Sequence, residues 1–509
     1  MADREAPRRP DPDGSRAAAQ ALDVLFVVVL AVYVASGRAI VPFHGDESTF
    51  LWMSRDAYTL IEGRGDTLRF DPETPEPLAQ WLRVLNGSLH PLATGAALYG
   101  LGMTRDELNL PWIWVLPKRP DSEQWDFNVA AGRLPGDAPL QLARSLSALA
   151  TAASVAVVFA IALATSRSRF AAWVATACYA TNPAILLNGR RAMQEGALLL
   201  TTALVVWFAL RLVRSNAPEP SNPEEDGAVP LPSLLALALA TGVAVAAKHA
   251  ALAVVVAVWI SLACRPFVIE HRPDPRGAVR QLMEIFGAGI ASIAVFTVLT
   301  PVWWSTPRTL ALTGFAALLA GTGLPLARRA GAALPALSIA LIGGALLAQP
   351  DLGSRTLRDV GHLVAARQAL VAEQAADTER TAGERVATLA REAFFAEPQF
   401  HEDPAWAGFP EIAAQVDTYR ATWLTGRTGA WRWLGLGLAA LAGIGAIGRL
   451  RRPRVPKNLL LLAWLCLPAA VLLASPLGWQ RYFLLIHAPL AIFAGLGAAT
   501  LWDRRAEPK

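Results

Sequence analysis

Residues 21–48 have the sequence ALDVLFVVVLAVYVASGRAIVPFHGDES, an apolar run that is followed at once by the acidic motif HGDES. The apolar part, from Ala21 to Ala39, is about as long as the ~20 residues that a helix needs to cross a bilayer. Such runs recur along the 509-residue chain, which is 54% hydrophobic and only 17% charged. Soluble domains usually carry about 25% charged residues. The composition therefore predicts a polytopic membrane protein and excludes an ordinary soluble enzyme.

The apolar runs predict an all-α protein with about twelve transmembrane helices. Arginines and the few lysines cluster in the short loops between these runs, for example at 166–169 and 449–457. With the N-terminus inside, every such basic loop falls in the cytoplasm, as the positive-inside rule requires. Both termini are therefore predicted to be cytoplasmic. The predicted spans lie near residues 21–39, 141–165, 170–188, 196–213, 233–247, 250–264, 282–303, 309–326, 330–347, 431–448, 458–474 and 481–501.

Some of these assignments have alternatives. The first run could be a secretory signal peptide, since arginines precede it, but the many later runs favour a span. The runs near 309–326 and 330–347 are short and rich in Gly and Ala, so they could form a re-entrant pair or packed helices. The chain as a whole is rich in Ala and Arg and poor in Lys. This composition is typical of GC-rich prokaryotes and predicts location in the plasma (inner) membrane.

Two long segments, 41–139 and 349–430, fall on the extracytoplasmic side of this topology. In the first, Trp112 and Trp114 indicate parts that lie at the membrane interface. In the second, apolar residues recur at three-to-four spacing with charges between them, which predicts soluble amphipathic helix. From their position and size, we expect the two segments to form a cap that binds the acceptor substrate of a reaction at this membrane face. The predicted parts are a disordered cytoplasmic tail (1–20), an N-terminal transmembrane module (21–348), the extracytoplasmic helical segment (349–430), C-terminal transmembrane helices (431–503) and a cytoplasmic tail (504–509).

The motif HGDES at 44–48 lies where the chain leaves the first span on the extracytoplasmic side. Charges at the end of a span cost little, so the motif could simply begin a solvated loop. Alternatively, a carboxylate here could act as a general base that takes the proton of an acceptor hydroxyl, which accelerates attack by about 10²–10⁴-fold. Asp46 and Glu47 are therefore the candidate catalytic residues.

Other segments place titratable groups at the same membrane level. Each group has a structural interpretation when taken alone: Arg144 and Arg481 could anchor their spans, and His90 could be an ordinary loop histidine. Lys248 and His249 could polarise a tight turn. Together, however, the basic groups on the outer side oppose the positive-inside bias and predict an anionic partner. The further candidates are His90, Arg144, Arg190, Arg191, Glu195, Lys248, His249, Arg481 and Tyr482.

A lipid-linked phosphate at the outer leaflet fits this pattern. A phosphate leaving group is already anionic, so it needs the cations that Lys and Arg supply more than it needs a proton donor. A carboxylate opposite this cluster would deprotonate the acceptor hydroxyl, which could then displace the phosphate at the anomeric carbon of a sugar. Attack on the face opposite the leaving group would invert the configuration of that carbon. The basic residues form no single patch, so no nucleic-acid partner is expected.

At these residues the sequence resembles the lipid-carrier-dependent glycosyltransferases of the GT-C fold. These include the dolichyl-phosphate-mannose–protein mannosyltransferases and the bacterial aminoarabinose transferases that act on lipid A. One proline of the family's His-Pro-Pro-Leu segment is missing at 90–92, and nothing resembles the lumenal β-trefoil repeats of the eukaryotic enzymes. The motifs that carry the resemblance are HGDES (44–48), LHPLATGAALYGL (89–101), ARSLSAL (143–149), GRRAMQE (189–195), AAKHAAL (246–252) and WQRYFLLIHAPLAIFAGLG (479–497).

The resemblance implies an enzyme that moves a sugar, with inversion, from a polyprenyl- or dolichyl-phosphate donor to a hydroxyl of a protein, lipid or glycan. It implies that Asp46 is the base and that Glu47 supports it. It also implies that Lys248, Arg481 and Tyr482 contact the lipid phosphate. The implied positioning residues are His90, Arg144, Arg191, Glu195 and His249.

Two questions stay open at this point. Asp46, Glu47 and Glu195 could hold a divalent metal ion, but no ligand spacing demands one. A secondary transporter or flippase of a lipid-linked or anionic substrate is the alternative function, although the sequence shows no paired halves with matching broken helices. A non-catalytic envelope assembly protein is a further alternative, and it would tolerate the substitution Asp46→Asn.

Overall fold

In the computed structural model of the protein, all regular secondary structure of the described part is helical, with no strand among the residues concerned. These are residues 12–71, 73–114, 123–215, 231–268, 275–305, a few positions between 361 and 372, 381–401, 406, 408–425, 431–451, 455–475 and 477–506. The helices discussed below are α1 (Pro12–Ser36), α2 (Gly45–Met53), α3 (Arg55–Ile61), α4 (Pro77–Leu85), α5 (Leu89–Gly100), α6 (Gln124–Ala130), α7 (Asp137–Ser166), α8 (Arg169–Ala180), α9 (Pro183–Asn188), α10 (Glu195–Ser215), α11 (Leu231–Ala247), α12 (Leu252–Val268), α13 (Pro275–Leu299), α18 (Ala382–Phe394), α19 (Pro410–Arg420), α20 (Trp431–Leu450), α21 (Pro456–Ala474) and α22 (Gln480–Ala506).

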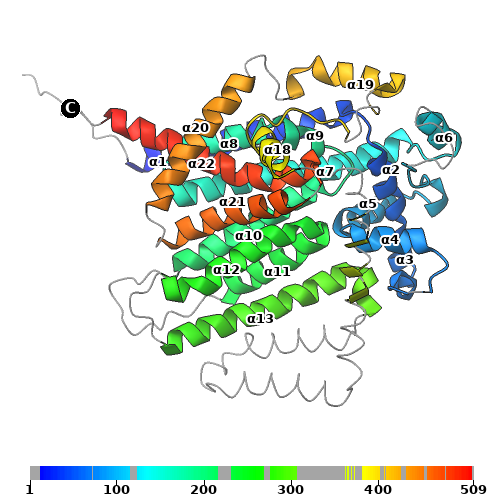
Figure 1. The fold of residues 1–509 in the computed structure, drawn as a ribbon, viewed down its shortest axis with the longest axis horizontal. Coiled ribbons are helices and arrows are strands. Elements are labelled where there is room, and N and C mark those ends of the chain that lie inside the picture. Colours follow the sequence, from blue (N-terminus) through cyan, green and yellow to red (C-terminus); the bar gives the residue numbers. More distant parts are fainter. Residues whose placement is uncertain are drawn as a thin grey trace, which may run out of the picture.

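The long helices lie side by side in rows, and the short helices α2 to α6 gather at one end of these rows (Figure 1). Among the described residues, six helices are long and apolar enough to cross a bilayer, which makes the chain an integral membrane protein. The segments that meet this criterion are Arg16–Ile40, Asp137–Ser166, Glu195–Val213, Trp433–Leu450, Pro456–Ala474 and Gln480–Asp503, with shorter apolar helices at Pro232–Ala247, His249–Arg265 and Glu284–Leu299.

The predicted total of twelve spans is not confirmed. The predicted span near 170–188 is broken into α8 and α9, because Asn182 caps a new helix and Pro183 occupies its first turn. The spans near 309–326 and 330–347 lie outside the described residues. The other predicted spans coincide with helices.

The N-terminal boundary also differs from the prediction. Helix α1 begins at Pro12, so residues 12–20 are helical although the tail 1–20 was expected to be disordered. The apolar run of the first span therefore continues a helix that starts earlier. Residues 1–11 lie outside the described part of the chain.

Close helix packing holds the membrane-spanning part together, and α20 and α22 pack closely against each other. At Gly497 of α22, an added Cβ atom would run into the carbonyl oxygen of Leu441, and at Gly445 of α20 it would run into that of Phe493. Glycines at such crossings let two helix backbones approach directly, which is how helices associate within a bilayer.

The two long segments 41–139 and 349–430 meet in one apolar cluster. Phe43 and Trp112 from the first segment pack there with Trp406 and Tyr419 from the second, all buried. The Trp406 indole Nε1 donates to the Phe43 carbonyl at 3.3 Å. This cluster fixes the chain on the N-terminal side of HGDES, and thereby positions the start of α2.

Candidate active site

The HGDES motif forms the start of α2. The His44 side chain accepts a hydrogen bond from the Asp46 backbone N–H at 3.1 Å, and the His44 N–H donates to Glu47 Oε2 at 3.0 Å. This reciprocal arrangement is a capping box, which satisfies N–H groups that a helix start leaves unpaired. Gly45 is required by space, because a Cβ atom there would lie 2.6 Å from the Trp112 ring. The motif thus places both carboxylates in the first helical turn.

Glu47 is fully buried and saturated with donors. The Arg144 guanidinium donates to both of its oxygens, from Nε to Oε1 and from Nη2 to Oε2, each at 2.8 Å. The backbone N–H of Ala192 donates to Oε1 at 2.7 Å. Burial raises the pKa of Glu47, but the Arg144 guanidinium and the hydrogen bonds outweigh burial and hold the pKa below its usual value. Glu47 is therefore an ionised group that ties together α2, α7 and the loop before α10.

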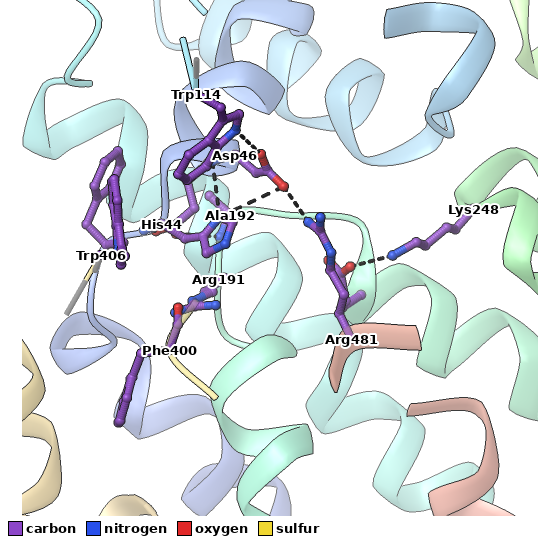
Figure 2. Close-up of polar contacts among 12 residues, drawn as sticks. His44, Asp46, Trp114, Arg191, Ala192, Lys248, Phe400, Trp406 and Arg481 are labelled. Atoms are coloured by element: carbon purple, nitrogen blue, oxygen red, sulfur yellow. Dashed lines mark hydrogen bonds and ion pairs between the residues drawn. The ribbon is translucent and has the colours of Figure 1, made fainter. Parts of the chain in front are cut away.

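Asp46 has a different environment from its neighbour. Its side chain is 19% exposed, whereas that of Glu47 is 0% exposed. The Trp114 indole Nε1 donates to Oδ1 at 2.9 Å, and Arg481 Nη1 pairs with Oδ2. Figure 2 shows the Asp46 carboxylate between these two side chains, which come from opposite sides. Asp46 is thus held in a fixed position while part of it stays accessible.

A second ion pair lies next to Arg481. Lys248 Nζ donates to Glu195 Oε1 at 2.6 Å (Figure 2). Lys248 Nζ also lies 5.0 Å from the centre of the Tyr482 ring, and the Arg481 guanidinium carbon lies 5.9 Å from the same centre. Trp479 stacks on Tyr482 with ring centres 5.6 Å apart. One aromatic ring therefore contacts both cations, and cation–π attraction of about 0.5–1 kcal/mol or more helps to keep them together.

The loop before α10 contributes one of its two arginines. Arg191 is buried, donates through Nη2 to the Phe400 carbonyl at 2.6 Å, and lies close enough to Glu47 to lower the pKa of that carboxyl. Arg190 is also buried but points elsewhere, with Nε donating to the Val34 carbonyl at 2.7 Å. Arg191 therefore belongs to the site, and Arg190 holds α1 against the loop.

His90 and His249, the two predicted positioning histidines, have separate environments. His90 is buried on α5 and hydrogen-bonds the Ala192 backbone. Burial lowers the pKa of His90 to about 4, so the ring is neutral near neutral pH. The negative charge of Glu195 acts to raise the pKa of His90. The His249 ring packs against Phe296 of α13 with ring centres 6.0 Å apart. His90 therefore lies beside the carboxylates, whereas the ring of His249 contacts the apolar helix α13.

Several residues of the site were not identified as such from the sequence. Trp114 was interpreted as an interfacial aromatic residue, yet it holds Asp46. His401 stacks on Trp114 with ring centres 4.5 Å apart, and Trp406 lies 5.1 Å from Trp114. These residues come from the two long segments 41–139 and 349–430 and are far apart in the sequence. Only their aromatic character could have indicated them.

Gln480 is a further residue that the sequence did not indicate. Its Nε2 donates to Glu392 Oε2 at 2.8 Å, and its Oε1 accepts from Asn188 at 3.3 Å. It is buried and directly precedes Arg481. Gln480 thus attaches the start of α22 to α9 and α18, and fixes the position from which Arg481 reaches Asp46.

A divalent ion between Asp46, Glu47 and Glu195 does not fit this arrangement. Each of the three carboxylates already pairs with a cationic side chain, from Arg481, Arg144 and Lys248 respectively. Within the described ranges, no three or more His, Cys, Asp or Glu side chains are grouped so that they could hold a metal ion.

Comparison with known proteins bears on the class of this site. Residues 120–304 match the model of the dolichyl-phosphate-mannose-protein mannosyltransferase family. This match confirms the resemblance. The matched segment includes Arg144, Arg191, Glu195 and Lys248 of the site described above. No curated protein sequence matches the chain.

Solved structures of membrane glycosyltransferases also align with the chain. The oligosaccharyltransferase AglB from Archaeoglobus fulgidus aligns over 96% of this chain and 51% of its own, at 12% identity and a TM-score of 0.49. This chain therefore spans about half the length of that protein. The Pmt1–Pmt2 O-mannosyltransferase of S. cerevisiae aligns over 55% and 34%, at 17% identity and a TM-score of 0.38. ArnT from Cupriavidus metallidurans aligns over 95% and 78%, at 15% identity and a TM-score of 0.33.

Proposed function

We propose that the protein is an inverting glycosyltransferase that moves a sugar from a polyprenyl- or dolichyl-phosphate donor to an acceptor hydroxyl at the extracytoplasmic membrane face. The observation that carries this proposal is the Asp46 carboxylate, which is held by Trp114 and Arg481 and remains partly accessible. The family match over residues 120–304 supports the same class of enzyme.

Asp46, rather than Glu47, is the base. Glu47 lies between two donors of Arg144 and a backbone N–H, and its pKa is lowered, so it has no accessible oxygen with which to take a proton. Asp46 shares the same helical turn but exposes part of its carboxylate. Glu47 acts through its neighbours, because it fixes the helix start that carries Asp46.

The donor phosphate binds at Arg481 and Lys248. Arg481 is joined to Asp46 through Nη1, and the planar guanidinium can present further N–H groups to phosphate oxygens. Lys248 lies beside the same Tyr482 ring and adds a second positive charge. With the phosphate at these cations and the base next to Arg481, the anomeric carbon lies between the leaving group and the acceptor.

The reaction is a single displacement. The acceptor O–H proton passes to Asp46 as the acceptor oxygen bonds to the anomeric carbon, and the bond from that carbon to the phosphate oxygen breaks. The bonding electrons leave with the lipid phosphate, whose added negative charge Arg481 and Lys248 stabilise. Attack opposite to the leaving group inverts the anomeric configuration.

The site lies at the end of the long helices where α2 to α6 gather, and not in the middle of the bundle (Figure 1). This position fits chemistry at a membrane face, and nothing in the described part of the chain supports the alternative of a transporter. The positive-inside pattern assigns that face to the extracytoplasmic side. The segments 41–139 and 349–430 border the site and are the proposed acceptor-binding cap. The acceptor is a hydroxyl of a protein, lipid or glycan.

The test uses purified full-length protein in lipid with radiolabelled polyprenyl-phosphate sugars. Wild type should release or transfer the sugar, and the product should have the anomeric configuration opposite to that of the donor. Asp46→Asn should lose turnover while it still binds the lipid. Turnover unaffected by this substitution would move the base to Glu47 or Glu195. Absence of turnover with every donor, together with substrate flux in sealed vesicles, would establish the transporter instead.

A further inference from the structure

A cleft of about 340 Å³ lies outside the site described above, on the segment that follows HGDES. Its size is at the low end of the range for small-molecule sites, about 300–1,000 Å³. Helices α2 and α3 supply Trp52, Arg55 and Asp56 to its wall. The start of α4, the turn before it and Arg105 also line the cleft. We name it the arginine cleft.

Two guanidinium groups of the arginine cleft repel each other. The charge of Arg105 lowers the pKa of Arg55, in addition to a larger effect of burial, and the opposing effect of Asp106 is smaller than both. Among the described residues, neither arginine has a carboxylate within ion-pairing distance. Arg55 donates through Nη2 to the Leu108 carbonyl at 2.7 Å, while its buried Nε has no hydrogen-bond partner. An anion in the cleft would remove both the repulsion and the unpaired N–H.

The carboxylates of the cleft leave this positive charge uncompensated. Asp56 is fully engaged by Arg83, which donates to its two oxygens at 2.7 and 2.8 Å. Glu76 is exposed and lies at the edge, where α4 begins. The lining arginines therefore exceed the lining carboxylates by one positive charge. The excess comes from Arg55 and Arg105.

The aromatic residue of the lining is Trp52, which is half-buried. An indole beside two guanidinium groups suits a sugar ring that carries a negative charge. The C–H groups of a sugar ring pack on aromatic side chains, and guanidinium forks bind carboxylate or phosphate in bidentate fashion. We propose that the arginine cleft binds an anionic carbohydrate, a sugar bearing a phosphate or carboxylate group, with Arg55 and Arg105 on the anion and Trp52 on the sugar ring.

The position of the cleft indicates what its ligand is for. Trp52 lies on the same helix as Asp46, six residues later, which is about 9 Å along the axis. The cations proposed for the donor phosphate, Arg481 and Lys248, come from α22 and the turn after α11, neither of which lines the cleft. We assign the cleft to the acceptor, and this assignment rests on the proposed function. The acceptor is then an anionic glycan whose charged part is anchored here.

The test measures binding of glucose 6-phosphate, glucuronate, glucose and inorganic phosphate to the full-length protein in detergent by ligand-observed NMR. All proteins compared carry Arg481→Gln, which weakens the proposed donor site by removing one of its two phosphate-binding cations, Arg481 and Lys248. Glucose 6-phosphate or glucuronate should bind, glucose should not, and added salt should weaken binding. Arg105→Gln should weaken binding at least tenfold, and this change does not endanger the fold because Arg105 makes no side-chain hydrogen bond among the described residues. Arg64→Gln, at an exposed arginine paired with Glu62, is the matched control and should leave binding unchanged.

Further variants separate the parts of the proposal. Trp52→Leu should weaken the binding of glucose 6-phosphate and leave the binding of inorganic phosphate unchanged. Equal binding of inorganic phosphate and glucose 6-phosphate, both insensitive to Trp52→Leu, would overturn the carbohydrate assignment. Binding that survives Arg105→Gln, or no binding at all, would overturn the cleft as a site. Asp46→Asn should not change the binding of these ligands to the cleft. Binding to the cleft is therefore measured independently of turnover, and failure of the cleft proposal can be told apart from failure of the proposed enzymatic function.

Discussion

Two ion pairs that begin at adjacent residues differ in their burial and in how their carboxylates are bonded. The inner pair, Glu47 with Arg144, is buried, bidentate and surrounded by further donors. The outer pair, Asp46 with Arg481, is partly exposed and joins the start of α2 to the start of α22. On the proposed function, one acidic motif supplies both a structural ion pair and a reactive carboxylate. The helix turn separates the two, because successive side chains point about 100° apart.

The largest expected effect comes from breaking the inner pair. Arg144→Ala leaves the buried Glu47 charge uncompensated, which costs about 3–5 kcal/mol for a buried pair. We expect a large fall in the thermal unfolding temperature of the purified protein in detergent, with loss of activity that follows the loss of folded protein. The control is Arg38→Gln, on a partly buried arginine whose described bonds are to Ser145 and a backbone carbonyl. A normal unfolding temperature in Arg144→Ala would contradict the structural role of the inner pair.

Breaking the outer pair should instead lower the affinity for the lipid-phosphate sugar donor. Arg481→Gln removes a charged hydrogen-bond donor worth about 1.5–3 kcal/mol, or roughly 10–150-fold in donor affinity. The unfolding temperature should stay near that of wild type because the pair is partly exposed. Donor titration with lipid-phosphate sugars measures the effect, and Arg481→Lys should restore part of it. Unchanged donor affinity would remove Arg481 from the phosphate site.

The smallest of these effects is a pH dependence that arises beside the inner pair. The pKa of His90 is about 4 in the folded protein against 6.5 in the unfolded chain, so the neutral ring contributes stability that is fully present above pH 6.5. As pH falls through 6.5 towards 4, the unfolded state takes up the proton first and this stability is lost. At pH 5 the loss is about 2 kcal/mol. The drop in unfolding temperature between pH 7 and pH 5 should shrink in His90→Asn; an equal drop in both proteins would contradict the burial of a neutral ring.

Much of the fold follows directly from the sequence, because a helix that crosses a bilayer needs a long apolar run and satisfies its own backbone. The spans of α1, α7, α10 and α22 are clear on this basis. The break between α8 and α9 was missed, since an apolar run continues across it and only the local Asn182–Pro183 signal marks a new helix start. Apolar length alone does not distinguish a continuous span from two short helices.

The site could be predicted only in part. HGDES identifies its two carboxylates because acidic residues at a span end are conspicuous, and the basic residues opposite them follow from the topology. The division of roles between Asp46 and Glu47 depends on which one meets Arg144, and that is a contact across 97 positions. Trp114 likewise reaches Asp46 across 68 positions. Tertiary contacts of this kind leave no periodicity in the sequence.

The measurement that tests this division most directly compares Asp46→Asn and Glu47→Gln in parallel, with turnover of a lipid-phosphate sugar and thermal unfolding read on the same preparations. We predict that Asp46→Asn lowers kcat by about 10²–10⁴-fold at an unchanged unfolding temperature. We predict that Glu47→Gln lowers the unfolding temperature, with a loss of turnover that follows the loss of folded protein. Two results would contradict the account. Near wild-type turnover in Asp46→Asn would move the base to Glu47 or Glu195, and a fully stable Glu47→Gln protein without turnover would make Glu47 the reactive carboxylate.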